Sequence, residues 1–164
     1  MGQFWTSVND VLDYAIGEGQ KAVFTYRAFA READSAEMRR IFSGLVADEV
    51  AHFKKLLKLR KASTFTVTDG SLGGLKPRPV KLPPGHLREP AAAYRFALQT
   101  EKSACELYTM LSQMAKEPEI RQVFETLAAA EQGHRAKLEN ELEQGKSAIG
   151  FLKGLLHLPF SLRR

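Results

Sequence analysis

Two short motifs in this sequence each combine an acid with an imidazole. Glu49 is followed by His52, and Glu131 is followed by His134, so each Glu-x-x-His pair lies three residues apart. In an α-helix this spacing places both side chains of a pair on the same face, on neighbouring turns. Carboxylate oxygens together with imidazole nitrogens suit iron or manganese, and zinc is an alternative. Both pairs are therefore candidate metal ligands.

The apolar residues around the two pairs predict where these side chains point. Phe42 precedes Glu49 by seven residues and Phe124 precedes Glu131 by seven, so each glutamate shares the apolar face of its helix. An ionised carboxylate in the core is costly unless it is paired or bound to a cation, and two such acids repel each other. A divalent metal is the simplest resolution. The alternative is a buried network of salt bridges and hydrogen bonds without metal.

An internal repeat relates the two motifs. A gapless shift of 82 residues pairs Ala15 with Ala97, Ala22 with Ala104, Tyr26 with Tyr108, Ala33 with Ala115, Arg39 with Arg121, Phe42 with Phe124, Leu45 with Leu127, Glu49 with Glu131 and His52 with His134. Such self-similarity indicates two copies of one structural unit. We expect two helical hairpins, related by a pseudo-two-fold axis, that bury their apolar stripes against each other.

Capping and breaking residues predict an all-α fold of four helices. The first helical block runs from about Ser7 to Ala62 with one break near residues 31–35, where Asp34 or Ser35 can cap a second helix. Pro90 and Pro118 suit the first turns of a third helix, to about residue 116, and of a fourth, to about residue 144, where Gly145 would end it. Residues 1–145 would form the bundle, with a Pro- and Gly-rich crossover at about 63–89, and residues 146–164 an amphipathic C-terminal helical tail.

Composition limits the remaining possibilities. The 164 residues carry 24 Lys and Arg against 19 Asp and Glu, and 44% are hydrophobic, which is typical of one globular domain and excludes a disordered or collagen-like chain. Cys105 is the single cysteine, so any metal must be held by carboxylates and imidazoles.

Without a secretory signal or an apolar run long enough to span a membrane, a cytoplasmic location is expected. No recognition-helix pattern accompanies the net charge of +5, so nucleic acid is not expected as a partner.

A third acid, Glu101, lies seven residues before Tyr108 on the third helix. With it the sequence resembles the ferritin-like di-iron superfamily, and in particular rubrerythrin-like proteins, in which two helices each carry a Glu and two carry Glu-x-x-His. The resemblance covers about residues 10–142 and rests on the two motifs, on the segment from Ala97 to Tyr108, and on the phrases IFSGLVADEVAH and VFETLAAAEQGH. It implies a ferritin-like four-helix bundle that binds two iron ions.

The resemblance also implies a role for each ligand. In the family the single glutamates are terminal ligands, one for each iron, and the glutamates of the Glu-x-x-His pairs bridge the two ions. Carried over, Glu101 and His134 hold one ion, His52 holds the other, and Glu49 and Glu131 bridge them. Tyr26 and Tyr108 would donate hydrogen bonds to the carboxylates, and the alternative is that they are ordinary core tyrosines.

One position departs from the family pattern. The repeat pairs Glu101 with Gly19, so the terminal ligand of the first helix is missing. Glu18 is adjacent but rotated by about 100° around the helix, and a one-residue distortion between the flanking glycines would swing it inward. The alternative is that Glu18 is an exposed acid. We therefore predict two unequal metal sites, of which the weaker empties first or is completed by water.

The chemistry implied by the resemblance is ferroxidase, peroxidase or iron handling, with dioxygen or peroxide as substrate. Rubrerythrin itself has a rubredoxin domain, in which a four-cysteine site delivers electrons, and with Cys105 alone this chain has none. Peroxidase turnover would therefore need an external electron donor.

The C-terminal tail suggests a function of another class. Phe151, Leu155, Leu158 and Leu162 form one stripe, which would pack on the bundle or on a partner subunit, so that a homodimer is expected. Attachment to a membrane surface is an alternative. Residues 158–164 also resemble the peptides that load ferritin-like cargo into encapsulin shells, which would place the protein inside such a compartment. The alternative function is thus a metal-poor interaction module that docks a partner or shell through its tail.

Overall fold

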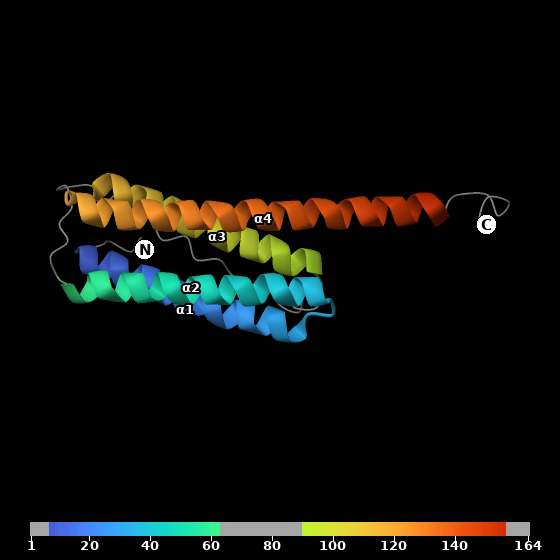
Figure 1. Cartoon of the computed structure of the whole chain (residues 1–164), viewed down its shortest axis with the longest axis horizontal. Helices are drawn as coiled ribbons and strands as arrows, with labels where there is room; N and C mark the ends of the chain where they lie inside the picture. Colours follow the sequence, from blue (N-terminus) through green and yellow to red (C-terminus); the bar gives the residue numbers. More distant parts are fainter. Residues whose placement is uncertain (1–6, 63–89, 157–164) are drawn as a thin grey trace, which may run out of the picture.

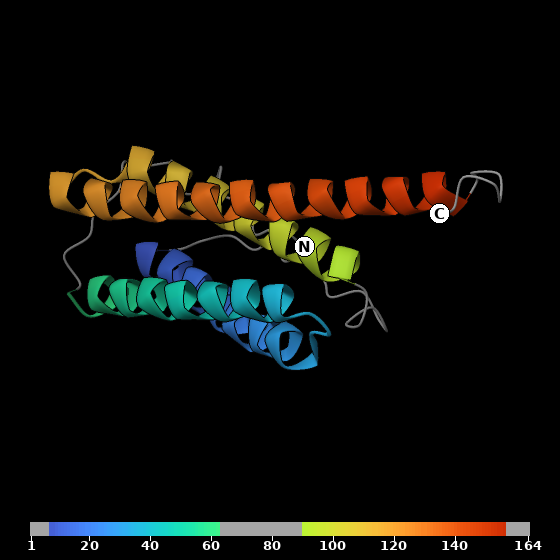
Figure 2. The ribbon, with the colours of Figure 1, turned by 45° about the vertical axis from the view of Figure 1, so that its right-hand side comes forward.

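A computed structural model of the chain describes residues 7–62 and 90–156, with side chains as far as residue 145. Four helices follow one another: α1 (Val8–Glu32), α2 (Ala36–Ala62), α3 (Pro90–Met114) and α4 (Pro118–Leu156). Helix α1 packs mainly against α2, and α3 mainly against α4, so that two antiparallel hairpins lie against each other (Figure 1, Figure 2). The predicted all-α four-helix bundle is confirmed, while the crossover and the end of the tail lie outside the described residues.

Local sequence explains where the helices begin. The Ser7 hydroxyl accepts a hydrogen bond from the Asp10 amide at 3.2 Å, and the Asp10 carboxylate accepts one from the Ser7 amide at 2.8 Å, which together form a capping box. The Ser35 hydroxyl caps α2 by accepting from the Met38 amide at 3.0 Å. Helices α3 and α4 begin at Pro90 and Pro118, where the missing amide hydrogen costs nothing.

The end of the fourth helix differs from the prediction. Helix α4 does not stop at Gly145 but continues to Leu156, a total of 39 residues from Pro118 (Figure 1), so the predicted end was wrong. A glycine inside a helix costs only about 1 kcal/mol relative to alanine, and helix-forming neighbours on both sides offset this. The start of the predicted tail is therefore a direct extension of α4. No helix in the described ranges is both long and apolar enough to cross a membrane.

The hairpin turns show the internal repeat directly. In the first hairpin the Arg39 guanidinium donates to the Ala33 carbonyl at 3.0 Å, and in the second the Arg121 guanidinium donates to the Ala115 carbonyl at the same distance. Each partner in one hairpin is 82 residues from its counterpart in the other. The two repeats therefore close their turns in the same way.

The core consists of two apolar clusters. The buried members of one are Ala22, Tyr26, Phe29, Ala30, Ala33, Met38, Ile41, Phe42, Leu45, Ala93, Tyr94, Ala97 and Leu138. Those of the other are Val11, Leu12, Ala15, Leu56, Tyr108, Leu111, Met114, Ala115, Phe124 and Leu127. Along every helix the residues between these clusters lie near the middle of the bundle, so the clusters cover both sides of a central layer.

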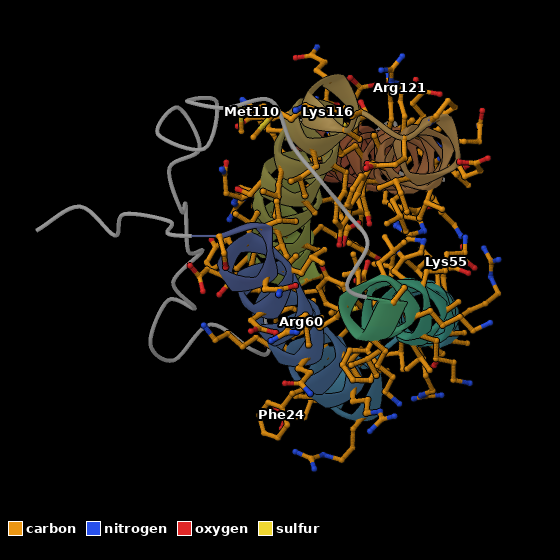
Figure 3. All side chains as sticks on the ribbon, turned by 90° about the vertical axis from the view of Figure 1, so that its left-hand side faces the viewer. Phe24, Lys55, Arg60, Met110, Lys116 and Arg121 are labelled. Atoms are coloured by element: carbon orange, nitrogen blue, oxygen red, sulfur yellow. The ribbon has the colours of Figure 1, made fainter. Side chains whose placement is uncertain are left out.

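Removing a core side chain should cost much more than removing an exposed one. Leu127 is fully buried, so Leu127→Ala is expected to lower the free energy of unfolding by about 2–5 kcal/mol. Phe24 is 78% exposed and points away from the bundle (Figure 3), so Phe24→Ala should change it by less than about 0.5 kcal/mol. Urea unfolding followed by circular dichroism measures both. Equal losses would contradict this assignment of the core.

Candidate metal centre

Five acidic and imidazole side chains fill the central layer. They come from three helices and are each at most 9% exposed: Glu49 and His52 of α2, Glu101 of α3, and Glu131 and His134 of α4. Apolar residues one and two turns away on the same helix faces hold them there, as the periodicity predicts. All five residues that the sequence singled out as principal ligands therefore lie in one region of the interior.

Four of these residues form a compact group. Glu49, Glu101, Glu131 and His134 each offer a ligand atom, and these atoms all lie within 4.8 Å of one another. Nδ1 of His134 is 2.9 Å from Oε2 of Glu101 and 3.1 Å from Oε2 of Glu131. Ligands at about 2 Å from a common ion lie up to about 4 Å apart. One metal ion could therefore contact all four after small side-chain movements.

His52 lies on the opposite side of the shared glutamates. Its Nδ1 atom is 2.9 Å from Oε1 of Glu131 and 3.6 Å from Oε1 of Glu49. Yet both Nδ1 of His52 and Oε1 of Glu131 are buried without a hydrogen-bond partner among the described residues, because the angles are unsuitable. Such orphaned polar atoms cost about 1–3 kcal/mol each. A cation between them would satisfy both, so the residues present fit a second metal ion.

Position 19 faces the centre but contributes no ligand. A Cβ atom built on Gly19 would lie 3.9 Å from Oε2 of Glu49, so the helix face is the one that the repeat predicts. The neighbouring Glu18 forms an ion pair with Lys21 at 2.7 Å and keeps 27% of its side chain exposed. Helix α1 stays α-helical through Gly17 and Gly19, without a bulge. Glu18 is therefore not among the clustered acids, and its role as a ligand stays a prediction.

The two tyrosines that the repeat relates, Tyr26 and Tyr108, differ in whether their hydroxyl group binds a carboxylate. The Tyr26 hydroxyl donates a hydrogen bond to Oε1 of Glu101, and burial raises the pKa of Tyr26 far enough to keep it a neutral donor. Tyr108 is only 3% exposed, and within residues 7–62 and 90–145 its hydroxyl has no hydrogen-bond partner. The counterpart of Glu101 on the first helix is Gly19, which has no side chain that could accept a hydrogen bond from Tyr108.

Sequence reasoning missed one residue at the rim of the centre, Asp48, whose side chain is 58% exposed. Its Oδ2 atom lies 3.1 Å from Nε2 of His134, across the interface between the hairpins. A carboxylate at this ring nitrogen orients the imidazole and leaves Nδ1 directed at Glu101 and Glu131. The only available signal was the acid directly before Glu49. The repeat gave no support for it, because the counterpart of Asp48 is Ala130.

Mutual contacts set the protonation of the centre. Burial alone would raise the pKa of Glu131, but the hydrogen bond from His134 and the close contact with the His52 imidazole outweigh it and lower the pKa to about 2. Burial alone would lower the pKa of both histidines, but the neighbouring carboxylates raise it to about 9 for His52 and about 11 for His134. Burial raises the pKa of Glu101 well above its usual range. Protons thus hold the ligand atoms together near neutral pH.

Metal binding should release these protons. The pKa values of His52 and His134 are about 9 and about 11, so at pH 7 both imidazoles are protonated and must lose about one proton each to ligate. The affinity for Mn(II) is expected to rise as the pH increases from about 6 to 8.5. Calorimetric titrations in buffers of different ionisation enthalpy count the protons released. An affinity independent of pH, with no proton release, would contradict the assignment of these ligands.

The contact of Asp48 with His134 should matter for affinity. Asp48→Ala frees the imidazole to rotate, so Mn(II) binding is expected to weaken by about 10-fold or more. Glu37→Ala is the matched control, because Glu37 is an exposed acid of the same helix whose partner is Arg40. Calorimetry with Mn(II) measures both variants. If both bind Mn(II) as the unchanged protein does, Asp48 has no such role.

Comparison with known proteins agrees with this geometry. The family model for rubrerythrin matches residues 95–157, which comprise most of α3 and all described residues of α4. A hypothetical protein from Pyrococcus furiosus has a similar structure, with a TM-score of 0.67 and 26% sequence identity over 84% of this chain and 89% of that one. No curated protein matches the chain. Residues 95–157 thus match the rubrerythrin family model, as the resemblance predicted, and the fold is a ferritin-like four-helix bundle.

Proposed function

We propose that the chain binds two divalent ions, iron in the cell, and uses them in redox chemistry of the ferroxidase or peroxidase type or in iron handling. The observation that carries this proposal is the buried group of Glu49, Glu101, Glu131 and His134. Burying three carboxylates together is costly without a cation. The rubrerythrin match over residues 95–157 supports the same conclusion.

The donor set suits iron. Glu101 and His134 would hold one ion, His52 the other, and Glu49 and Glu131 would lie between them. Fe(II) ions held by these hard carboxylate oxygens would supply the electrons for reduction of dioxygen or peroxide. The protein contributes two apolar clusters that fix these side chains from both sides of the layer.

Two neighbouring side chains hold the ligands in place. The hydrogen bond from Tyr26 directs one oxygen of Glu101 and leaves the other facing His134. Asp48 orients the His134 ring from the opposite side. With Cys105 as its single cysteine, the chain has no four-cysteine site for electron delivery. Peroxidase turnover would therefore draw electrons from an external donor.

Removing Glu131 should remove both ions. Its two oxygens lie 2.9 Å from Nδ1 of His52 and 3.1 Å from Nδ1 of His134, so it contacts both halves of the centre. Glu131→Ala is expected to lose both metals, His52→Ala only one, and the exposed Glu125→Ala neither. Metal analysis of protein purified without chelator counts the ions. Aerobic addition of Fe(II), followed by ferric absorbance, measures oxidation above a buffer blank.

The outcomes separate the possible readings. Full occupancy in a folded Glu131→Ala variant would show that this glutamate does not bridge the ions. Near-zero metal in the unchanged protein, with no oxidation above the blank, would overturn the proposal. It would instead favour the metal-poor interaction module.

A further inference from the structure

A cavity between α1 and α3 reaches the candidate metal centre. Its volume is about 520 Å³, and its lining includes Gly19 and four acids, Glu18, Glu49, Glu101 and Glu106. Cavities of about 300–1,000 Å³ are typical of small-molecule sites. The space is there partly because position 19 has no side chain, and small residues on both helices, among them Ala15 and Ala104, also line it.

Tyr108 provides a hydrogen-bond donor in this cavity. The 82-residue repeat pairs Tyr26 with Tyr108 and Glu101 with Gly19. Where Tyr26 donates to the carboxylate of Glu101, the hydroxyl of Tyr108 has no counterpart acid, and no other partner within the described side chains. Tyr108 is almost completely buried, with 3% of its surface exposed, and it lines the cavity. A carboxylate placed near position 19 could therefore accept a hydrogen bond from the Tyr108 hydroxyl.

We propose that this cavity binds a small organic monocarboxylate, whose acid group takes the place of the carboxylate that Gly19 lacks. The acid would accept a hydrogen bond from Tyr108 and complete the coordination of the ion held by His52. The apolar remainder of the ligand would lie against Ala104 and Leu107, which also line the cavity. This inference rests on the proposed function, because it requires an ion at His52.

Charge makes the binding of this ligand depend on metal. Glu49 is 4% exposed and Glu131 is fully buried, so a further anion beside them is repelled unless a cation is present. Binding of the carboxylate and of the second ion must therefore strengthen each other by the same factor. Glu18 also lines the cavity, but its carboxylate is paired with Lys21 at 2.7 Å in the structure.

The test is calorimetric titration of the full chain with Mn(II), at constant ionic strength, in chloride and in acetate, butyrate or benzoate. In the unchanged protein the weaker ion is expected to bind about tenfold tighter in butyrate, while the stronger ion changes little. Carboxylate in the buffer also binds free Mn(II), which lowers the apparent affinity of both sites equally. The change at the stronger site measures this effect and is subtracted from the change at the weaker site. Mn(II) affinity is read directly, so the result does not depend on activity.

Four variants make the test specific. Gly19→Glu supplies the acid internally and should bind the second ion tightly without any carboxylate, whereas Gly19→Gln fills the same space with a neutral amide and should stay weak in every buffer. Tyr108→Phe should lose most of the gain from butyrate. Gly17→Glu adds the same acid to the same helix where nothing lies within 4 Å of a Cβ atom, so it should behave as the unchanged protein.

Each further outcome has one meaning. Two bound ions whose affinities are the same in chloride and butyrate would overturn this inference and leave the proposed function intact. Loss of the weaker ion in Glu18→Gln would identify Glu18 as its ligand and would also overturn the inference. If even Gly19→Glu binds no Mn(II), the proposed function fails, and this inference fails with it.

Discussion

The structure depends on the cost of keeping three glutamates in one buried layer between two apolar clusters. Replacing such a layer by leucines would be more favourable for stability alone, because buried charges rarely repay their desolvation. The histidines and Tyr26 offset part of the cost, but Nδ1 of His52 and Oε1 of Glu131 stay unsatisfied. A centre that is incomplete without a cation, inside an otherwise close-packed bundle, indicates that the layer exists for what it binds.

The two halves of the centre differ although a repeat produced them. On one side His134 has Glu101 and Asp48 as partners, and Glu101 has Tyr26. On the other side the corresponding positions are Gly19 and Ala130, and Tyr108 lacks its acid. Both of these differences remove a polar group from the same half, and Gly19 of that half lines the cavity together with Glu101 of the other half. The repeat therefore supplies fewer protein ligands on the side of His52 than on the side of His134.

Much of this could be predicted from the sequence, because helical spacing fixes which residues share a face. The burial of Glu49, Glu101 and Glu131 follows from the apolar residues one and two turns away. The end of α4 could not be predicted, because the free-energy cost of one glycine in a helix is smaller than the favourable contribution of its helix-forming neighbours. The contact of Asp48 with His134 could not be predicted either. The two residues are 86 positions apart, and their contact depends on the rotation of α2 relative to α4. The cavity depends in the same way on the separation of α1 and α3.

The two interpretations of the buried residues, a hydrogen-bonded network and a metal site, describe the same side chains in two states. The raised pKa values of both histidines and the lowered pKa of Glu131 mean that, without a cation, protonated imidazoles balance the charge of the carboxylates. On the proposed function, a metal ion would take the place of these protons, and the ligand residues already lie close together on their helices. What separates the states is the pair of unsatisfied atoms at His52 and Glu131, which protons leave without hydrogen bonds and a cation would engage. On the proposed function, the half of the centre with the fewest protein ligands is therefore also the half that a cation would stabilise most.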